Sequence, residues 1–504
     1  MTIVRAFCTG LLISRIFAVS PAGSASPDWR IEDFALEGRI DDITVSDLNH
    51  DCRYDLLVIH HIPAPVPAYT SRRITLLLQD ETGQFIHKGH RLPAVPDKAV
   101  CYDLADADND GDTDILFLTS GGVTAFLWGD SSFSGPDHLI TYRPRIPEAD
   151  PASLPRWRFA RDITGDAAPE LILPGPDELA VFIRTGNRYS PSRHLWSHPA
   201  GRIIQENPLI MESRLPVLAV CDFNRDSIPD FLVTGRDVVD VFLMHDQWIH
   251  HTDSTLIPPD FRYRRDFQAV QSASWEPVRP PRDRLRLHDL NRDNAVDMLI
   301  SQTPGAAFPY RISQLQIYIN RDGRFDKIPD QILTSDHMAV DFRLRDMNGD
   351  GLEDVILFHL PAGLTQGIKL VLTQKLTHRV SIHLMRPDYS YQQIPDADFQ
   401  FRRKPLLTDG LSPNAWIHSL EGDFNGDNLP DLMIAPDEKR FIVYPGHRKT
   451  GFSKKDRFEI PSSGFTGLCI QDINEDRISD LILWDQKNPS GRFRLVISHH
   501  SERP

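Results

Sequence analysis

The chain has 504 residues, of which 40% are hydrophobic and 25% are charged, as in an ordinary globular protein. Its formal net charge of −15 at pH 7 argues against nucleic acid as a partner, because surfaces that bind nucleic acid are basic. After the first 25 residues there is no apolar stretch long enough to cross a bilayer, so the sequence predicts no membrane span.

Residues 1–25 resemble a secretory signal peptide. They contain two arginines and no acid, residues 6–19 are mostly apolar, and small residues stand at 23–25, where a signal peptidase would cut. We therefore predict a signal segment over residues 1–25, one domain over residues 26–504, and a secreted, periplasmic or cell-surface location. The alternative for residues 1–25 is a disordered tail.

A nine-residue pattern recurs eight times along the rest of the chain. It places oxygen-bearing side chains at positions 1, 3, 5 and 9, and a short apolar run follows each copy. Successive copies begin 49–77 residues apart. Their first residues are Asp47, Asp106, Asp162, Asp222, Asp289, Asp346, Asp423 and Asp472.

This spacing of oxygen donors suits a hard cation. Calcium takes six to eight oxygen ligands, and acidic side chains at alternate positions of a tight loop can converge on one point. An EF-hand closes its shell with a glutamate at position 12 between two helices, whereas here the last acid stands at position 9 before a β-prone run. The pattern therefore predicts several structural Ca²⁺ ions in loops of another kind. A solvated Asx-rich turn is the alternative for any single copy.

Seven copies carry a complete set of candidate ligands, with aspartate at positions 1, 5 and 9 and aspartate or asparagine at position 3. These predicted metal ligands are Asp47, Asn49, Asp51, Asp55, Asp106, Asp108, Asp110, Asp114, Asp222, Asn224, Asp226, Asp230, Asp289, Asn291, Asp293, Asp297, Asp346, Asn348, Asp350, Asp354, Asp423, Asn425, Asp427, Asp431, Asp472, Asn474, Asp476 and Asp480.

The third copy departs from this set. It has Thr164 at position 3 and Glu170 at position 9, and we expect it to hold an ion weakly or not at all. Position 6 should need a positive φ, which glycine adopts at little cost and asparagine tolerates. Among the eight copies only Gly111 and Gly351 supply glycine at this position.

Each copy lies between two predicted strands, and a third follows a turn later. The runs after the loops are apolar on both faces, as expected of strands packed between neighbouring sheets. These second runs are 56–59, 115–118, 171–173, 231–233, 298–300, 355–358, 432–434 and 481–483. The third runs are 75–78, 124–128, 179–183, 238–244, 315–319, 369–372, 441–444 and 493–497. An aromatic after a turn, as at Phe85, Phe325 and Phe452, should open a fourth strand.

Eight such units predict an all-β fold, an eight-bladed β-propeller with Ca²⁺-binding loops between the first and second strands of each blade. The last unit has no room for a fourth strand after its third. Residues 28–34 precede the first unit and have the pattern of an outer strand. We therefore expect residues near 28–37 to join the last blade and close the ring, which removes a sheet edge.

The repeat resembles the FG-GAP or VCBS-type repeats of extracellular β-propellers, including the propeller of integrin α-chains. The resemblance covers roughly residues 28–500 and rests on the Asp-x-[Asp/Asn]-x-Asp-Gly-x-x-Asp loop, which is matched best from Asp106 and from Asp346. It implies that the loops bind calcium and brace their blades, and that the protein acts outside the cell.

The long connections are where a ligand would be expected, because loops on a rigid scaffold usually carry function. Residues 129–158, 246–284 and 375–415 stand out, and the last two combine aromatic residues with arginines, a mixture that suits sugars and uronic acids. The candidates are Trp248, Phe261, Arg262, Tyr263, Arg264, Arg265, Phe267, Trp275, Tyr389, Tyr391, Arg402, Arg403, Lys404 and Trp416. Ordinary outer strands and loops are the alternative.

Two functions follow from these observations. The sequence has no nucleophile elbow, phosphate loop, dinucleotide fingerprint or zinc-peptidase motif. We therefore favour a non-enzymatic binding or adhesion module for an extracellular glycan or protein. The alternative is an extracellular polysaccharide-active enzyme, most plausibly a lyase, because some lyases share a calcium-bearing propeller. That analogy of fold does not decide function.

Overall fold

The computed structural model describes most of the chain as β structure. The described residues are 14–18, 28–62, 71–86, 94–129, 132–146, 154–175, 178–186, 188–196, 201–206, 209–213, 215–234, 238–244, 256–264, 285–302, 313–335, 337–360, 376–403, 418–437, 439–462, 465, 467–485 and 490–499. They contain no helix, and therefore none that could cross a membrane.

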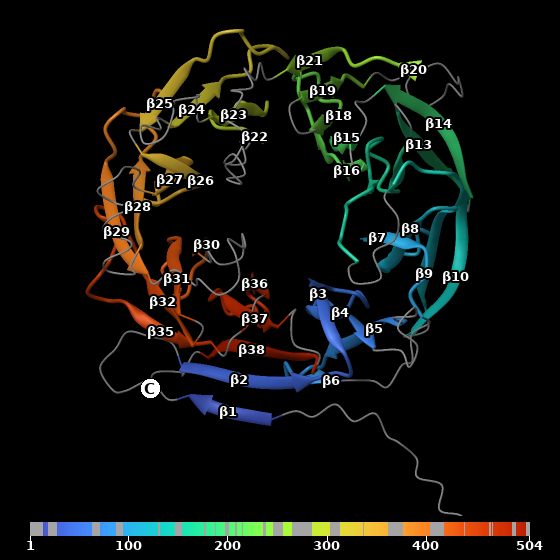
Figure 1. Ribbon diagram of the computed structural model, residues 1–504, viewed down its shortest axis with the longest axis horizontal. Coiled ribbons are helices and arrows are strands. Elements are labelled where there is room, and N and C mark those ends of the chain that lie inside the picture. The colour runs from blue at the N-terminus through green and yellow to red at the C-terminus, as the bar shows by residue number, and fades with distance from the viewer. Residues whose placement is uncertain are drawn as a thin grey trace, which may run out of the picture. The chain divides into compact units, whose positions relative to one another are not determined.

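The chain divides into two compact units, and Phe34–Phe267 make up most of the first. This unit holds four sheets of four or five strands that run from blue to green in Figure 1, with orders β3-β4-β5-β6, β7-β8-β9-β10, β11-β12-β13-β14-β20 and β17-β18-β19-β21. The strands are β3 Arg39–Ser46, β4 Asp55–Ile62, β5 Ser71–Gln79, β6 Phe85–Ile86, β7 Ala99–Ala105, β8 Asp114–Thr119, β9 Gly122–Gly129, β10 Ser132–Thr141, β11 Ala160–Arg161, β12 Glu170–Pro174, β13 Glu178–Thr185, β14 Arg188–Trp196, β17 Val217–Cys221, β18 Asp230–Thr234, β19 Val238–Phe242, β20 Leu256–Ile257 and β21 Phe261–Arg264.

The second unit consists of Ser14–Asp33, Gln268–Trp484 and Phe493–Pro504. Its sheets have the orders β22-β23-β24-β25, β26-β27-β28-β29, β30-β31-β32-β35 and β1-β2-β38-β37-β36. The strands are β22 Leu285–His288, β23 Asp297–Gln302, β24 Ser313–Tyr318, β25 Gln331–Ser335, β26 Met338–Arg345, β27 Asp354–Leu360, β28 Leu376–His383, β29 Ala397–Arg403, β30 His418–Gly422, β31 Asp431–Asp437, β32 Arg440–Tyr444, β35 Phe458–Pro461, β36 Gly467–Gln471, β37 Asp480–Trp484, β38 Arg492–His499, β1 Ser14–Ala18 and β2 Asp28–Ala35.

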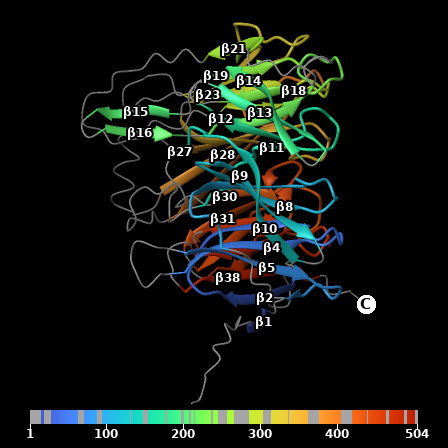
Figure 2. The ribbon, with the colours of Figure 1, turned by 90° about the vertical axis from the view of Figure 1, so that its right-hand side faces the viewer.

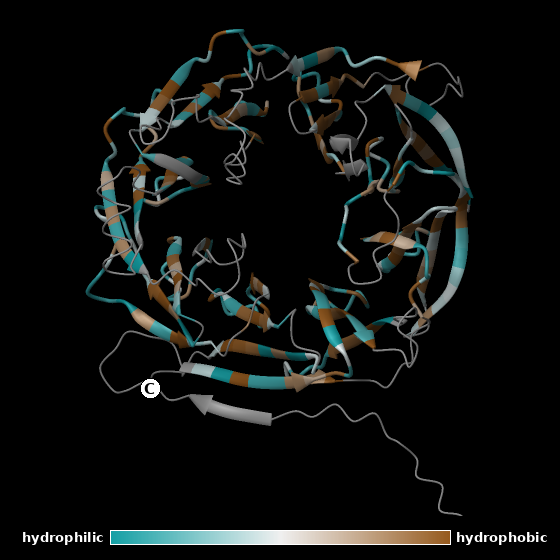
Figure 3. Ribbon diagram, in the orientation of Figure 1, coloured by the Kyte–Doolittle hydropathy of each residue, from teal (hydrophilic) through white to brown (hydrophobic). Residues whose placement is uncertain are grey.

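These eight sheets are the blades of an eight-bladed β-propeller, as the sequence predicted. In every blade the nine-residue pattern joins the first strand to the second, for example β7 to β8 or β26 to β27. The second strands are buried over most of their length, and β8 and β37 are buried at every residue. Brown segments along the strands in Figure 3 mark these apolar residues. Burial on both faces explains why the second strands read as continuous apolar runs.

The last blade takes strands from both ends of the chain. Strand β2 lies between β1 and β38 in this sheet. Arg494 of β38 binds the carboxylate of Asp33 of β2 through two nitrogens, with contacts of 2.5 and 2.8 Å. Trp29 and Ile31 of β2 belong to the same buried cluster as Val496 of β38. Strand β1, which pairs with β2, falls inside the predicted signal segment 1–25.

The outer strands differ from the sequence expectation more than the others. Phe85 opens the outer strand β6, but Phe325 lies in the irregular segment before β25, and Phe452 belongs to a separate hairpin of β33 (Gly446–His447) and β34 (Gly451–Phe452). The expected third strand at 369–372 lies outside the described residues, and β28 holds the third position of that blade. An aromatic after a turn is a weak signal because it marks burial rather than strand pairing.

One hairpin of the first unit does not belong to a blade. Strands β15 (Gly201–Glu206) and β16 (Leu209–Ser213) pair only with each other. Figure 2 shows this hairpin extending beyond β12, β13 and β14 of the same unit.

Candidate metal centre

All eight loops share one backbone conformation. Positions 4 and 6 have a positive φ in each copy, from 56° at His50 and Arg292 to 98° at Gly111. The sequence predicted this for position 6 but gave no sign of it at position 4. Several residues that hold it are neither glycine nor asparagine, and a side chain with a β-carbon adopts this region at a cost of roughly 1–2 kcal/mol. These residues are His50, Cys52, Ala167, Arg225, Ser227, Arg292, Glu475 and Arg477.

Carboxylates at positions 1 and 5 hold this conformation through backbone hydrogen bonds. In the sixth loop, Asp346 accepts from the N–H groups of Asp350 at 3.1 Å and Gly351 at 2.6 Å. Asp350 accepts from the N–H of Leu352 at 2.8 Å. These are Asx-type turns, so the solvated-turn alternative describes part of what the aspartates do.

The position-9 carboxylate is buried in every blade. In the second loop, Asp114 is 0% exposed, and its Oδ2 accepts from the N–H of Ala107 at 2.7 Å. Its Oδ1 accepts from the N–H of Trp128 in β9 at 2.8 Å. Asp55, Asp230, Asp297, Asp354, Asp431 and Asp480 make the same two kinds of bond. In these seven blades the residue therefore links its loop to the third strand of its own blade or to the residues directly after that strand.

Burial raises the pKa of these carboxyl groups, because the low-dielectric interior disfavours the charged form. The pKa rises to about 6 for Asp55, Asp230 and Asp297, and to about 7 for Asp114, Glu170, Asp354, Asp431 and Asp480. A nearby cation would favour the ionised form again.

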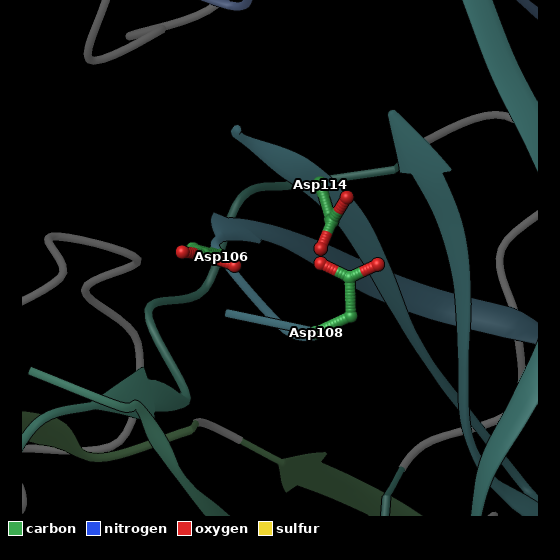
Figure 4. Close-up of side chains that lie close together, drawn as sticks. All are labelled: Asp106, Asp108 and Asp114. Atoms are coloured by element: carbon green, nitrogen blue, oxygen red, sulfur yellow. The ribbon is translucent and has the colours of Figure 1, made fainter. Parts of the chain in front are cut away.

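Two of the predicted ligand sets come together tightly. One oxygen from each of Asp106, Asp108 and Asp114 lies within 4.8 Å of the others in the second loop, and the same holds for Asp423, Asp427 and Asp431 in the seventh. Figure 4 shows the carboxylates of Asp108 and Asp114 turned toward one another. Within the described part of the chain no other loop brings three acidic groups this close.

The residue at position 3 explains what is distinctive about the second loop. In the six loops with asparagine there, its Nδ2 donates to the position-5 aspartate, as Asn348 does to Asp350 at 2.8 Å. Asp108 has no such donor, and its Oδ1 is buried without a hydrogen-bond partner among the described residues. A buried carboxylate oxygen without a donor is costly, and a cation would satisfy it. The oxygen-only donor set fits calcium.

Neighbouring loops are also linked, which the sequence did not show. The residue at position 8 of one loop contacts the start of the loop before it. Ser479 donates its backbone N–H to the carbonyl of Asp423 at 2.7 Å and accepts from the N–H of Asp423 at 3.0 Å. Thr113 donates to the carbonyl of Asp47 at 3.4 Å. Glu353 lies 3.6 Å from His288, which lowers the pKa of Glu353.

The aromatic and arginine candidates have mostly structural contacts where they are described. Arg262 binds the buried Asp240 through two nitrogens at 2.5 and 2.9 Å and lies 4.0 Å from the ring centre of Trp196. Tyr391 is buried and donates to the carbonyl of Glu353 at 2.8 Å, whereas Tyr389 is 43% exposed. Trp248, Arg265, Phe267, Trp275, Lys404 and Trp416 lie outside the described residues.

A comparison with known protein families agrees with this loop and strand pattern. Residues 47–117 and 289–357 match the FG-GAP-like repeat. The chain contains FG-GAP-like repeats. Each match runs from the first aspartate of one loop, through the whole of the next loop, into the second strand of the following blade, β8 in one case and β27 in the other.

Known structures resemble the FG-GAP-like chain only distantly, and no curated protein matches its sequence. BBS1N, solved in complex with ARL6DN, is 11% identical with a TM-score of 0.35, covering 81% of this chain and 95% of the other. An Agrocybe aegerita lectin specific for non-reducing terminal N-acetylglucosamine is 13% identical with a TM-score of 0.37, covering 73% and 86%. The V. cholerae biofilm matrix protein Bap1 is 13% identical with a TM-score of 0.30, covering 98% and 85%. These sequence identities and TM-scores are too low for the ligand or partner of any of these proteins to be assigned to this chain.

Proposed function

We propose that this protein is a secreted β-propeller binding module that calcium stabilises and that presents loops to an extracellular glycan or protein. The observation that carries the calcium part is the buried, unpartnered Oδ1 of Asp108, which faces Asp114 in a loop whose donors are all oxygens. In the second loop Asp106, Asp108, Asp110 and Asp114 would hold the ion, and in the seventh Asp423, Asn425, Asp427 and Asp431 would do so.

In this proposal calcium would stabilise the folded conformation of the loops. It would offset the repulsion between clustered carboxylates and the cost of the left-handed residues at positions 4 and 6. An ion that binds only the folded state stabilises it by mass action. The last blade, in which β2 lies beside β38, would close the ring, so that both ends of the chain are held by one sheet.

Thermal melts with calcium and with chelator test the ion. Asp350→Ala should lower the melting temperature more in calcium than in chelator, because in chelator the change removes only the bonds that the exposed carboxylate accepts from Asn348 and Leu352 of its own loop. Equal losses under both conditions would mean that the sixth loop holds no ion.

A panel of glycans and polysaccharides, incubated with the protein in calcium, tests the binding function. Retention without cleavage supports the module. New chain ends would instead establish a polysaccharide-active enzyme and overturn the proposal. No catalytic motif in the sequence favours that second outcome.

A further inference from the structure

Residues 154–161 carry three arginines along the inner strands of the first unit. This segment runs beside β7 before it enters β11: the N–H of Tyr102 donates to the carbonyl of Pro155 at 3.1 Å, and the N–H of Trp157 donates to the carbonyl of Tyr102 at 2.9 Å. Tyr102 and Arg156 form a parallel β-bridge. These backbone hydrogen bonds to β7 fix the segment that carries Arg156, Arg158 and Arg161.

The carboxylates in this region are already occupied. Asp103 is 1% exposed; it accepts from the N–H groups of Leu104 at 2.8 Å and Ala160 at 3.0 Å, and from Arg156 at 3.5 Å. Asp42 accepts from the N–H of Ile43 at 3.0 Å and from the hydroxyl of Tyr102 at 2.8 Å. Neither carboxylate forms an ion pair with Arg158 or Arg161 within the described residues.

Two of the three arginines make no hydrogen bond or ion pair with the part of the chain that is described. Arg158 is exposed and makes no hydrogen bond or ion pair there. Arg161 makes none either, and its Nε is buried. Burial and the charges of Arg158 and Arg156 lower the pKa of Arg161, although Asp103 acts in the opposite direction. A partly buried guanidinium with like charges around it is costly unless an anion joins it.

We propose that Arg156, Arg158 and Arg161 form an oxyanion site, and that the oxyanion is the carboxylate or sulfate group of an acidic sugar. Guanidinium groups bind planar carboxylates and sulfates through paired, charge-assisted hydrogen bonds. Arg156 would share its charge between Asp103 and the ligand, while Arg158 and Arg161 have their donors free for it. Oxyanion binding rests on the arginines alone, whereas the sugar rests on the proposed function.

Titration calorimetry of the full-length protein in calcium tests the site, with sodium sulfate, sodium galacturonate and an oligogalacturonate as probes and with polyglutamate of the same length as a comparison. Arg161→Gln and Arg158→Gln should each weaken binding on the order of tenfold, since each removes a charge-assisted contact. Arg188→Gln is the matched control, because Arg188 is an exposed arginine of β14 in the same unit. Arg158 is itself exposed, so its replacement does not endanger folding.

The outcomes separate the parts of the proposal. Absence of binding by all three probes, or equal affinities for Arg158→Gln, Arg161→Gln and Arg188→Gln, would overturn the oxyanion site. Tighter binding of oligogalacturonate than of polyglutamate of equal length supports the acidic sugar. Tighter binding of polyglutamate would assign the site to an acidic peptide and overturn the assignment to an acidic sugar. Anion binding without retention of any glycan in the panel would refute glycan binding as the proposed function and leave the anion site intact.

Discussion

The second and third loops have the same backbone and different chemistry. Both hold positions 4 and 6 at positive φ, through Asn109 and Gly111 in one and Gly165 and Ala167 in the other. Asp114 links its loop to β9, whereas Glu170 turns back and accepts from Ile163 at 2.9 Å and Thr164 at 3.3 Å. Among the described residues Glu170 accepts nothing from β13. The backbone conformation that the two loops share therefore needs only the Asx turns. Whether a loop can bind an ion depends separately on its set of oxygen donors.

The largest expected effect comes from removing the position-9 acid. Asp114→Ala leaves the buried N–H groups of Ala107 and Trp128 without acceptors and should lower the free energy of unfolding by roughly 3 kcal/mol. Glu170→Ala should cost less, roughly 1 kcal/mol, because Glu170 accepts only from Ile163 and Thr164 of its own loop and does not hold the loop to β13. Urea unfolding in chelator measures both. Equal losses would show that the link to the third strand adds nothing.

The effect of Asp108→Asn on the melting temperature should have opposite signs in chelator and in calcium. Asp108→Asn gives the second loop the amide that the asparagine loops use, so it should raise the melting temperature in chelator by relieving the unpartnered Oδ1. In calcium it should lower the melting temperature, because a charged ligand is lost. Thr164→Asp is the reciprocal change and should add calcium stabilisation to the third loop. A decrease in both solutions for Asp108→Asn would contradict the metal assignment.

The third loop should carry a pH dependence of its own. Burial raises the pKa of Glu170 from 4.5 to about 7, so the folded state binds this proton more tightly than the unfolded state. The free energy of unfolding should therefore fall as pH rises from about 4.5 to about 7. Glu170→Gln should remove the contribution of Glu170 to this slope and, in chelator at pH 8, be more stable than the wild type by on the order of 2 kcal/mol.

The control for this slope is Asp166→Asn, which changes an exposed acid of the same loop. It should keep the wild-type dependence on pH. If Glu170→Gln and the wild type have parallel stability curves between pH 4 and pH 8, Glu170 ionises as freely in the folded protein as in the unfolded chain.

The smallest expected effect concerns the backbone at position 6. Ala167 has a φ of 69°, and Ala167→Gly should stabilise the protein by about 0.5–1 kcal/mol by removing this strain. Gly111→Ala should destabilise it by about 1–2 kcal/mol, and only through the backbone, since no atom lies within 4 Å of the added β-carbon. Unfolding midpoints in chelator compare the two; a loss for Ala167→Gly would mean that strain does not limit this loop.

The sequence predicted best what depends on short-range chemistry. The loop positions, the second strands and the number of blades follow from a repeated local pattern and from burial on both faces. The positive φ at position 4 was missed because Arg225, Arg292 and Glu475 give no conformational signal. The absence of a hydrogen bond to the Arg161 side chain within the described residues was missed for another reason. Whether an arginine has a partner depends on which segments the fold brings to Asp103, and local sequence does not show this.

The pairing of β2 with β38 has a consequence for the order of events during synthesis. Asp33 and Arg494 are separated by 461 positions along the chain and meet in one sheet. Contacts of such long sequence separation form late and slowly, because the entropy of a very large loop must be lost first. While a ribosome is still translating, β2 has an unsatisfied edge, and the preceding blades can assemble before it finds its neighbour. A circular permutant that begins at β36 and joins residue 499 to β2 through a short linker would make this sheet from contiguous sequence and should fold faster.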